Sequence, residues 1–113
     1  MPELTTGQSI NKALELILHK DSTAFIAGED IGVYGGAFGV TEGLLDKFGQ
    51  DRIKDTPIAE DVIAGLAVGA SMTGSRPIVE MQFSDFIVNA MDPIVNQAAK
   101  LHFMYGGAVN VPI

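Results

Sequence analysis

One carboxylate in this sequence stands apart from its surroundings. Glu60 follows residues 57–59 and opens a stretch, residues 61–73, that is apolar almost throughout. A carboxyl at such a place is either a helix cap, because an acid in the first turn offsets the helix macrodipole, or a buried acid that exchanges a proton with a weak base. Asp61 can serve the capping role. Glu60 is therefore the first candidate for chemistry.

A second group of polar and aromatic residues follows the short apolar segment 77–81. Its members are Glu80, Gln82, Phe83, Asp85 and Phe86. The carboxyl ends of parallel strands are where α/β folds place ligands, so this group is suited to binding a flat ring. Strand alternation would direct Glu80 and Gln82 to one face and Phe83 to the other. From the sequence alone, core packing explains the two phenylalanines better.

A glycine-rich segment separates these groups from the start of the chain. Residues 28–39 hold five glycines, which indicates a loop with unusual backbone angles. The segment lacks the GxGxxG spacing and the lysine of a P-loop, and Glu29 and Asp30 would repel a phosphate. We favour a shaped loop at a strand end that positions other groups. Nucleotide binding through GVYGGAFG remains an alternative.

The composition narrows the classes of function. The chain has 113 residues and a net charge of −7, which argues against a nucleic-acid surface or a basic membrane patch. A hydrophobic content of 47% is high for a small monomer, so we expect part of the surface to meet a partner. There is no cysteine, and His19 and His102 have no metal-ligand neighbours at a suitable spacing. Without a signal-like start or a membrane-length apolar run, a cytoplasmic or organelle-matrix location is expected.

The elements that must position these residues alternate between helices and short apolar strands. A capping box at Thr5 and Gln8 begins the first helix. The further elements expected are a strand at 24–27, a helix at 42–48 capped by Thr41, a helix at 61–73, a strand at 77–81, a helix at 84–105 broken at Asp92–Pro93, and a strand at 108–113. Residues 51–56 are interpreted as a connection. The order favours an α/β fold, a parallel sheet with helices on both faces.

The helix at 61–73 carries an additional signal. Gly65 and Gly69 keep its surface low, so we expect another helix, from this chain or from a second chain, to approach closely. The extended sequence AVNVPI at 108–113 suggests that the strand it predicts enters a sheet completed by further residues. Residues 1–113 are therefore expected to form a single partial domain.

Four ordered motifs resemble those of a known family. They are GEDIGVYGGAFGVTEGL at 28–44, DTPIAE at 55–60, GSRPIVEMQFSDF at 74–86 and NQAAKLHFMYGG at 96–107. Through them nearly the whole chain resembles the N-terminal, pyrimidine-binding part of one subunit of a transketolase-like enzyme. That subunit is the beta subunit of the thiamine-diphosphate-dependent decarboxylase component of 2-oxoacid dehydrogenase complexes, of the pyruvate, acetoin and branched-chain types.

The resemblance implies an oxidoreductase assembled from several chains. It implies an α2β2 heterotetramer, with an alpha subunit and a second beta subunit as partners, and a lipoyl-bearing acyltransferase core. The alpha chain would hold the magnesium and the diphosphate of thiamine diphosphate, and this chain would hold the aminopyrimidine ring. The reaction implied is oxidative decarboxylation of a 2-oxo acid, with pyruvate as the expected substrate, and acyl transfer to lipoyl groups. The chain is not expected to be active alone.

The same resemblance assigns roles to single residues. Glu60 matches the family's catalytic glutamate, whose carboxyl hydrogen-bonds a nitrogen of the pyrimidine ring. Phe86 matches an aromatic residue that packs on this ring, Gln82 a position lining the same pocket, and Glu29 an acid near the channel between active sites. The backbone carbonyl of Ile113 falls where the family begins a structural potassium site.

Two other functions are kept beside this one. The first is an acetoin dehydrogenase beta subunit, which has the same motifs and a different substrate. The second is a non-catalytic interaction domain that keeps the fold without binding cofactor. Asp61 is a departure from the family, because relatives usually have a neutral residue after the catalytic glutamate.

Overall fold

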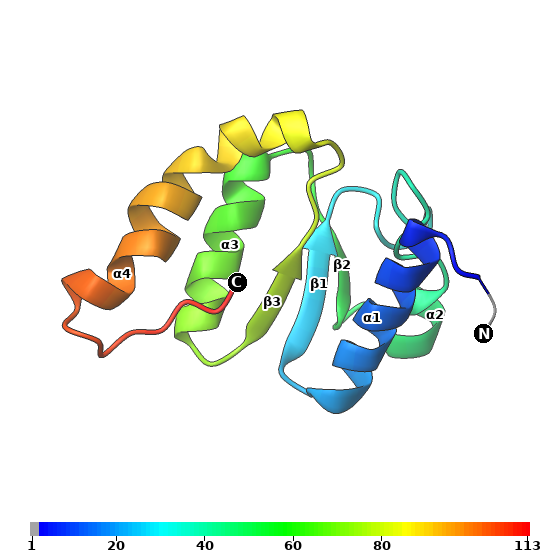
Figure 1. Cartoon of the computed structure of the whole chain (residues 1–113), viewed down its shortest axis with the longest axis horizontal. Coiled ribbons are helices and arrows are strands. Elements are labelled where there is room, and N and C mark those ends of the chain that lie inside the picture. Colours follow the sequence, from blue (N-terminus) through cyan, green and yellow to red (C-terminus); the bar gives the residue numbers. More distant parts are fainter. Residues whose placement is uncertain (1–2) are drawn as a thin grey trace.

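A three-stranded parallel sheet lies at the centre of the computed structural model, which describes residues 3–113. Its strands are β1 (Ala24–Gly28), β2 (Ile53–Asp55) and β3 (Arg76–Val79), in the order β2-β1-β3 (Figure 1). The register places Ile26 of β1 opposite Ile53 on one side and Ile78 on the other. All three carboxyl ends therefore meet at one edge of the sheet.

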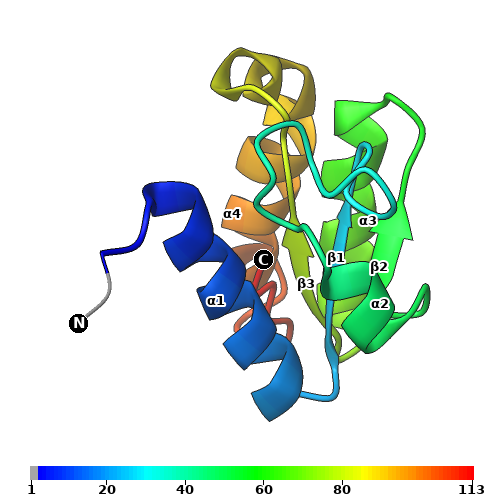
Figure 2. The same ribbon diagram turned by 90° about the vertical axis from the view of Figure 1, so that its right-hand side faces the viewer.

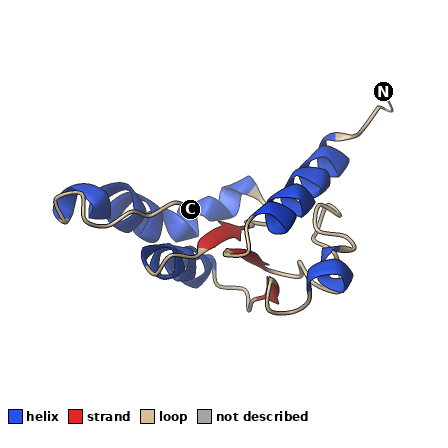
Figure 3. Ribbon diagram, turned by 90° about the horizontal axis from the view of Figure 1, so that it is seen from below, coloured by secondary structure: helices blue, strands red, loops and turns tan. Residues whose placement is uncertain are grey.

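Helices cover both faces of this sheet, as expected from the alternating order of the elements. The helices α1 (Thr6–Lys20) and α2 (Leu44–Phe48) lie on one face, and α3 (Glu60–Met72) lies on the other (Figures 1 and 3). Outside α3 runs a continuous helical segment with three different geometries. It consists of the 3₁₀-helix η1 (Ser84–Ala90), the π-helix η2 (Asp92–Ala98) and the α-helix α4 (Ala99–Met104).

The first helix is fixed by a local signal that the sequence already carries. The Thr5 hydroxyl accepts a hydrogen bond from the backbone of Gln8 at 3.2 Å, and the Gln8 side chain accepts one from the backbone of Thr5 at 3.0 Å. This reciprocal capping box satisfies two donors at the helix start. The helix then presents Leu18 to a core formed by side chains from β1, β2 and the loop between them. The buried members of this core are Leu18, Ala24, Ile26, Ile31, Leu44 and Ile53.

Three expectations about secondary structure are wrong. Residues 53–55 form a strand, because parallel pairing with β1 orders a segment too short to show a pattern of its own. Gly43, in the left-handed region, precedes α2 instead of Thr41, which is fully buried. Residues 108–113 form no strand. A strand requires a neighbouring backbone to pair with, and Pro112 has no N–H to donate.

The expected break in the last helical segment is confirmed. The chain changes from 3₁₀ to π geometry at Met91 and Asp92, where Pro93 occupies the first turn of η2. The Asp92 side chain accepts hydrogen bonds from the side chains of Asn96 at 2.8 Å and Gln97 at 3.3 Å.

No helix within residues 3–113 is long and apolar enough to cross a membrane.

The helix α3 lies between the sheet and the outer helical segment, and it contacts β3, η1 and η2. Its buried side consists of Ile63, Ala64, Ala67, Val68 and Ser71, in addition to Glu60. Another side of the same helix is open, because Val62 and Leu66 are exposed. A side chain added at Gly65 or Gly69 would meet nothing within 4 Å. The close approach expected at these glycines is therefore not made within the described chain.

Candidate functional site

Two acidic side chains are buried together at the carboxyl edge of the sheet. Glu29 directly follows β1 and is 4% exposed, while Glu60 begins α3 and is 9% exposed. Burial, together with the charge of the Glu60 carboxylate, raises the pKa of Glu29 above its usual value, although the backbone of Ala59 acts in the opposite direction. The neighbouring Asp61 is exposed and occupies the first turn of the same helix. The buried acid of this Glu-Asp pair is thus Glu60, as the sequence indicates.

An amide from the outer helical segment reaches the same place. The side chain of Asn89, on η1, donates a hydrogen bond to a carboxylate oxygen of Glu60 at 3.5 Å. Side chains three residues apart are eclipsed in a 3₁₀-helix, so Phe86 lies on the same face of η1 as Asn89. The structure therefore directs the aromatic residue and the amide toward the side of η1 that meets Glu60.

The segment that carries Gln82 and Phe86 is connected to the glycine-rich loop. The Gln82 amide donates to the Asp30 carboxylate at 3.5 Å, and Asp30 follows Glu29 directly. The Phe83 ring contacts the Phe86 ring edge-to-face, with 5.6 Å between the ring centroids. Figure 2 shows the loop after β1 beside the chain that leaves β3. Glu29, Glu60, Gln82 and Phe86, far apart in sequence, are thus gathered at one edge of the sheet.

Each of the three strands is followed by a side chain with one buried oxygen that has no hydrogen-bond partner within residues 3–113. Within residues 3–113, the buried side-chain oxygens without a hydrogen bond belong to Glu29 after β1, Thr56 after β2, Glu80 after β3, and Thr41 in the loop above them. Buried polar groups in proteins are nearly always paired, so such a group requires an explanation. All four oxygens lie toward the carboxyl edge of the sheet, Glu80 and Thr41 on its α1 side and Glu29 beside the start of α3.

Glu80 is the second acid whose proton affinity is altered at this edge. Burial raises the pKa of its carboxyl above the usual value. Its carboxylate lies beside Gly36 of the glycine-rich loop, on the α1 side of the sheet. The expected alternation after Val79 is wrong, because β3 ends there and Glu80, Met81 and Gln82 all line one hollow.

The chain around Glu29 is hydrogen-bonded to the end of β2, which leads to Glu60. The Asp55 carboxylate accepts a hydrogen bond from the backbone N–H of Gly32 at 2.7 Å, and the Thr56 N–H donates to the Gly28 carbonyl at 2.9 Å. A side chain at Gly32 would collide with the Asp55 carboxylate. Glycine at this position therefore lets the loop after β1 lie against the segment that leads to Glu60.

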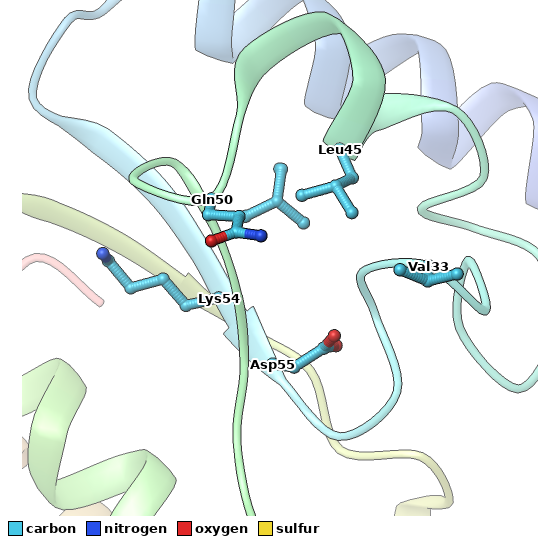
Figure 4. A pocket seen from close by; sticks show the side chains of 6 residues that line it. Val33, Leu45, Gln50, Lys54 and Asp55 are labelled. Carbon is cyan, nitrogen blue, oxygen red and sulfur yellow. The ribbon is translucent and has the colours of Figure 1, made fainter.

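Hollows lie on both sides of β2. An apolar cavity of about 410 Å³ adjoins the first turns of α3 and is bounded by Ala27, Pro57, Val62, Ile63 and Leu66 among others. A more polar hollow at the outer side of β2 is lined by Val33, Leu45, Gln50, Ile53, Lys54 and Asp55 (Figure 4). Figure 4 shows Lys54 and Asp55 pointing to opposite sides of the strand. Neither Glu29 nor Glu60 lines this second hollow.

Ile113 is separate from the other residues singled out by the sequence. It lines a hollow with Ile17, Arg76 and Pro77, beside the beginning of β3, whereas the acid pair lies beyond the carboxyl ends of the strands. Its N–H donates to the carbonyl of Val111 at 3.1 Å. Residues 3–113 contain no group of three His, Cys, Asp or Glu side chains that could hold a metal ion. The potassium role of Ile113 stays a prediction.

A parallel sheet with helices on both faces defines an α/β domain, the class of fold that places ligands at the carboxyl ends of its strands. The chain matches the pyrimidine-binding domain of transketolase over residues 2–113, and it belongs to that family.

Curated relatives show the same relationship in more detail. The chain is 49% identical, over 98% of its length and 31% of the relative, to the mitochondrial pyruvate dehydrogenase E1 component subunit beta of Dictyostelium discoideum. It is 45% and 46% identical, over its whole length and 35% of each relative, to pyruvate dehydrogenase E1 component subunit beta of Staphylococcus epidermidis and Staphylococcus aureus. The chain thus spans about a third of the length of these relatives.

Two residues of this edge are missing from the candidates that the sequence suggests. Asn89 has one local signal, its spacing of three residues from Phe86 in a helical segment. Phe38 has none, because its contact with Phe83, with 5.5 Å between ring centroids, joins positions 45 residues apart (83 − 38). Both contacts depend on how the loop and η1 are placed over the sheet.

Proposed function

We propose that this chain is the aminopyrimidine-binding part of a thiamine-diphosphate-dependent 2-oxoacid dehydrogenase, with pyruvate as the substrate. The family match and the pyruvate dehydrogenase beta subunits among the relatives support the proposal. The observation that carries it is the buried carboxyl of Glu60, which faces Glu29 and the Asn89 amide at the carboxyl edge of the sheet.

The residues at this edge fit a flat, polar ring. An aminopyrimidine has apolar faces and hydrogen-bonding edges, so it needs an aromatic or aliphatic wall and a few fixed polar groups. Phe86 is 38% exposed and offers part of its ring, while the unpaired oxygen of Glu29 and the carboxyl of Glu60 offer hydrogen-bonding positions. Gln82 lies close by through its contact with Asp30.

The proposed roles follow from these positions. Thiamine diphosphate, when bound, supplies the electron sink for decarboxylation of a 2-oxo acid. Glu60 holds a proton at the ring nitrogen, and its burial excludes water that would compete for that proton. Asn89 orients the Glu60 carboxyl, and Phe86 packs on the ring face. Burial and the neighbouring Glu60 carboxyl raise the pKa of Glu29, so Glu29 accepts a proton more readily than an isolated acid and places it beside Glu60.

The proposal extends to partners and ions. The diphosphate and its magnesium would be held by an alpha subunit, because residues 28–39 lack a phosphate-binding motif. A second beta subunit, or the alpha subunit, would cover the open side of α3, where Val62 and Leu66 are exposed and Gly65 leaves room. A lipoyl-bearing core would accept the acyl group. The partial domain formed by residues 1–113 and the potassium contact of Ile113 belong to the same proposal.

Glu60→Gln in the native assembly that contains this chain is the decisive test. The amide keeps the size of the side chain and removes the exchangeable proton, so decarboxylation of pyruvate should fall by about 100-fold or more. Thiamine diphosphate binding, measured by calorimetric titration, should stay within about tenfold. Asp61→Asn is the matched control, because Asp61 is the exposed acid next to Glu60 and should leave turnover unchanged. Near-normal decarboxylation by the Glu60→Gln protein would contradict the proposal.

Two alternatives are resolved by the same preparation. An acetoin dehydrogenase would turn over acetoin and leave pyruvate unconsumed, with the same dependence on Glu60. A non-catalytic interaction domain would show no saturable binding of thiamine diphosphate in the wild-type assembly, and substitution of Phe86 or Gln82 would have no effect. The retained burial of Glu60 speaks against this second alternative.

A further inference from the structure

The glycine-rich loop touches the segment that carries Gln82 and Phe86 at two separate points. Near the loop start, the Asp30 carboxylate accepts a hydrogen bond from the Gln82 amide at 3.5 Å. Eight residues later, the Phe38 ring contacts the Phe83 ring edge-to-face, with 5.5 Å between centroids and 76° between planes. Phe83 in turn contacts Phe86 in the same manner. Three aromatic rings thus form one row from the loop to η1.

The position of Phe38 is fixed by the backbone around it. Gly36 and Gly39 flank it, both with positive φ, at +83° and +69°. The Gly36 N–H donates to the Asp30 carbonyl at 2.8 Å, and the Gly39 N–H donates to the Gly36 carbonyl at 3.0 Å. These bonds make the loop a compact turn. Most L-residues avoid such angles, so glycine at these two positions allows the turn without backbone strain.

A second anchor joins the loop to the helix α1. The Asn11 side chain donates to the backbone carbonyls of Val40 at 2.9 Å and Glu42 at 3.1 Å. Phe38 and Gln82 also line the same apolar hollow of about 300 Å³ beside α1. The loop is therefore attached to the scaffold on one side and to the segment 82–86 on the other. Its exposed ring at Phe38 has a definite neighbour despite its 65% exposure.

We infer that the glycine-rich loop is a positioning platform for the proposed ring site, and that Phe38 is the positioning residue that sets the orientation of the Phe86 ring through Phe83. The inference rests on the proposed function, because it assigns to Phe38 an effect on the ring that Phe86 contacts. Contacts between aromatic rings restrict ring planes as well as ring positions, since edge-to-face and offset-stacked geometries are preferred over a face-to-face arrangement. Loss of Phe38 leaves Phe83, and with it Phe86, free to rotate.

The test measures cofactor affinity separately from chemistry. In the native assembly depleted of thiamine diphosphate, Phe38→Ala should raise the Kd for added thiamine diphosphate by roughly 3- to 10-fold, the factor that one aromatic pair contributes. At saturating cofactor, kcat for pyruvate should remain within about twofold, because Glu60 is untouched. Phe38→Tyr keeps the ring and should restore wild-type affinity. Phe38→Leu, which keeps apolar volume without an aromatic edge, should behave like Phe38→Ala.

Tyr34→Ala is the matched control. Tyr34 is an aromatic residue of the same loop, it is 72% exposed, and none of the aromatic contacts within residues 3–113 involves it. Its removal should leave the Kd unchanged. In a Phe83→Ala background, Phe38→Ala should add no further loss, because the contact between the two rings is already absent.

The outcomes separate the two proposals. If the wild-type assembly binds no thiamine diphosphate, the proposed function fails. If the wild type binds it and Phe38→Ala binds equally well, the positioning role fails while the proposed function stands. If Phe38→Ala and Phe38→Leu lower kcat and affinity together and Phe38→Tyr does not rescue, Phe38 has only a general structural role and the inference is overturned.

Discussion

The two ends of the β-sheet differ in how completely their polar groups are hydrogen-bonded. At the end where β1 begins, the Arg52 guanidinium donates to the carbonyls of Leu18 at 3.0 Å, of Asp21 at 2.7 Å, and of Ala24. The Asp21 carboxylate accepts hydrogen bonds from both the backbone and the hydroxyl of Thr23, at 2.8 and 2.6 Å. Every one of these donors and acceptors has a partner within the same fold.

At the other end of the sheet, partners are missing. One carboxylate oxygen each of Glu29 and Glu80, and the hydroxyl of Thr56, are buried without a hydrogen bond within the described residues, and the Glu29 and Glu60 carboxyls lie close enough to raise the pKa of Glu29. Sites that break the local rules of polar pairing are usually functional, and the rest of the fold compensates for their cost. We propose that the end with Arg52 stabilises the domain, whereas the incompletely paired groups at the end with Glu60 serve the proposed function.

Removal of Arg52 should produce the largest loss of stability. Arg52→Met keeps the aliphatic length and leaves partly buried carbonyls without a donor, at roughly 1–3 kcal/mol for the first unsatisfied group. We expect the free energy of unfolding to fall by about 3 kcal/mol in total, measured by urea titration of the chain. The affinity of the native assembly for thiamine diphosphate should not change. A variant as stable as wild type would show that this end of the sheet does not carry the stability.

A substitution at Gly32 should show how closely the glycine-rich loop packs on Asp55 at the carboxyl edge. Gly32→Ala introduces a methyl group that collides with the Asp55 carboxylate, whose hydrogen bond to the Gly32 N–H must then lengthen. We expect a loss of about 1 kcal/mol in unfolding free energy, the contribution of the weakened hydrogen bond, because the Asp55 carboxylate can turn away from the methyl group. Asp55→Asn combined with Gly32→Ala is the control for charge, because the amide removes the negative charge and keeps the collision with the methyl group. Equal stability of Gly32→Ala and wild type would contradict the close packing of the loop on Asp55.

The pH dependence of the free energy of unfolding should reveal the raised pKa of Glu80. Burial raises the pKa of Glu80 in the folded state above the unfolded value of 4.5, so the folded state binds more protons than the unfolded state as the pH rises through that window. Stability is therefore present below pH 4.5 and is lost as the pH rises through the raised pKa, with a slope of at most about 1.4 kcal/mol per pH unit. Glu80→Gln, which does not titrate, should flatten the curve of unfolding free energy against pH. An unchanged slope would exclude Glu80 as its source.

The smallest effect is expected on the open side of α3. Gly65→Ala adds a methyl group where nothing lies within 4 Å, and alanine favours a helix over glycine by about 1 kcal/mol. The chain by itself should therefore gain up to that amount, as seen by thermal unfolding. If a partner helix packs on Gly65 in the native assembly, Gly65→Leu should weaken the assembly in analytical ultracentrifugation. Full assembly of Gly65→Leu would show that this side is not an interface.

Several features of the fold follow from short sequence patterns. The capping box at Thr5, the apolar strands before Glu29 and Glu80, and the helix that begins at Glu60 each depend on residues within a few positions of one another. Dihedral preferences and side-chain periodicity act over this range, so a sequence determines them without knowledge of the rest. The break at Pro93 belongs to the same class, because proline acts on its own backbone.

Other features required the tertiary structure. The strand at 53–55 exists through its pairing with β1, and residues 108–113 form no strand despite their β-branched residues. Hydrogen bonding between strands is a property of two segments, so neither outcome can be determined from one segment alone.

For the site, the sequence alone determined that Glu60 enters an apolar helix, that a ring-and-amide group follows an apolar strand expected at 77–81, and that residues 28–39 form a loop. The tertiary structure decided that Glu29 lies against Glu60, that Asn89 reaches the same carboxyl, and that Phe38 meets Phe83. In each of these contacts the two residues are separated by between 29 and 45 positions in the sequence. The contacts exist because three parallel strands end at a common edge. The chemical type of a residue and its local secondary structure depend on nearby sequence positions, whereas the proximity of two distant residues depends on the packing of the whole domain.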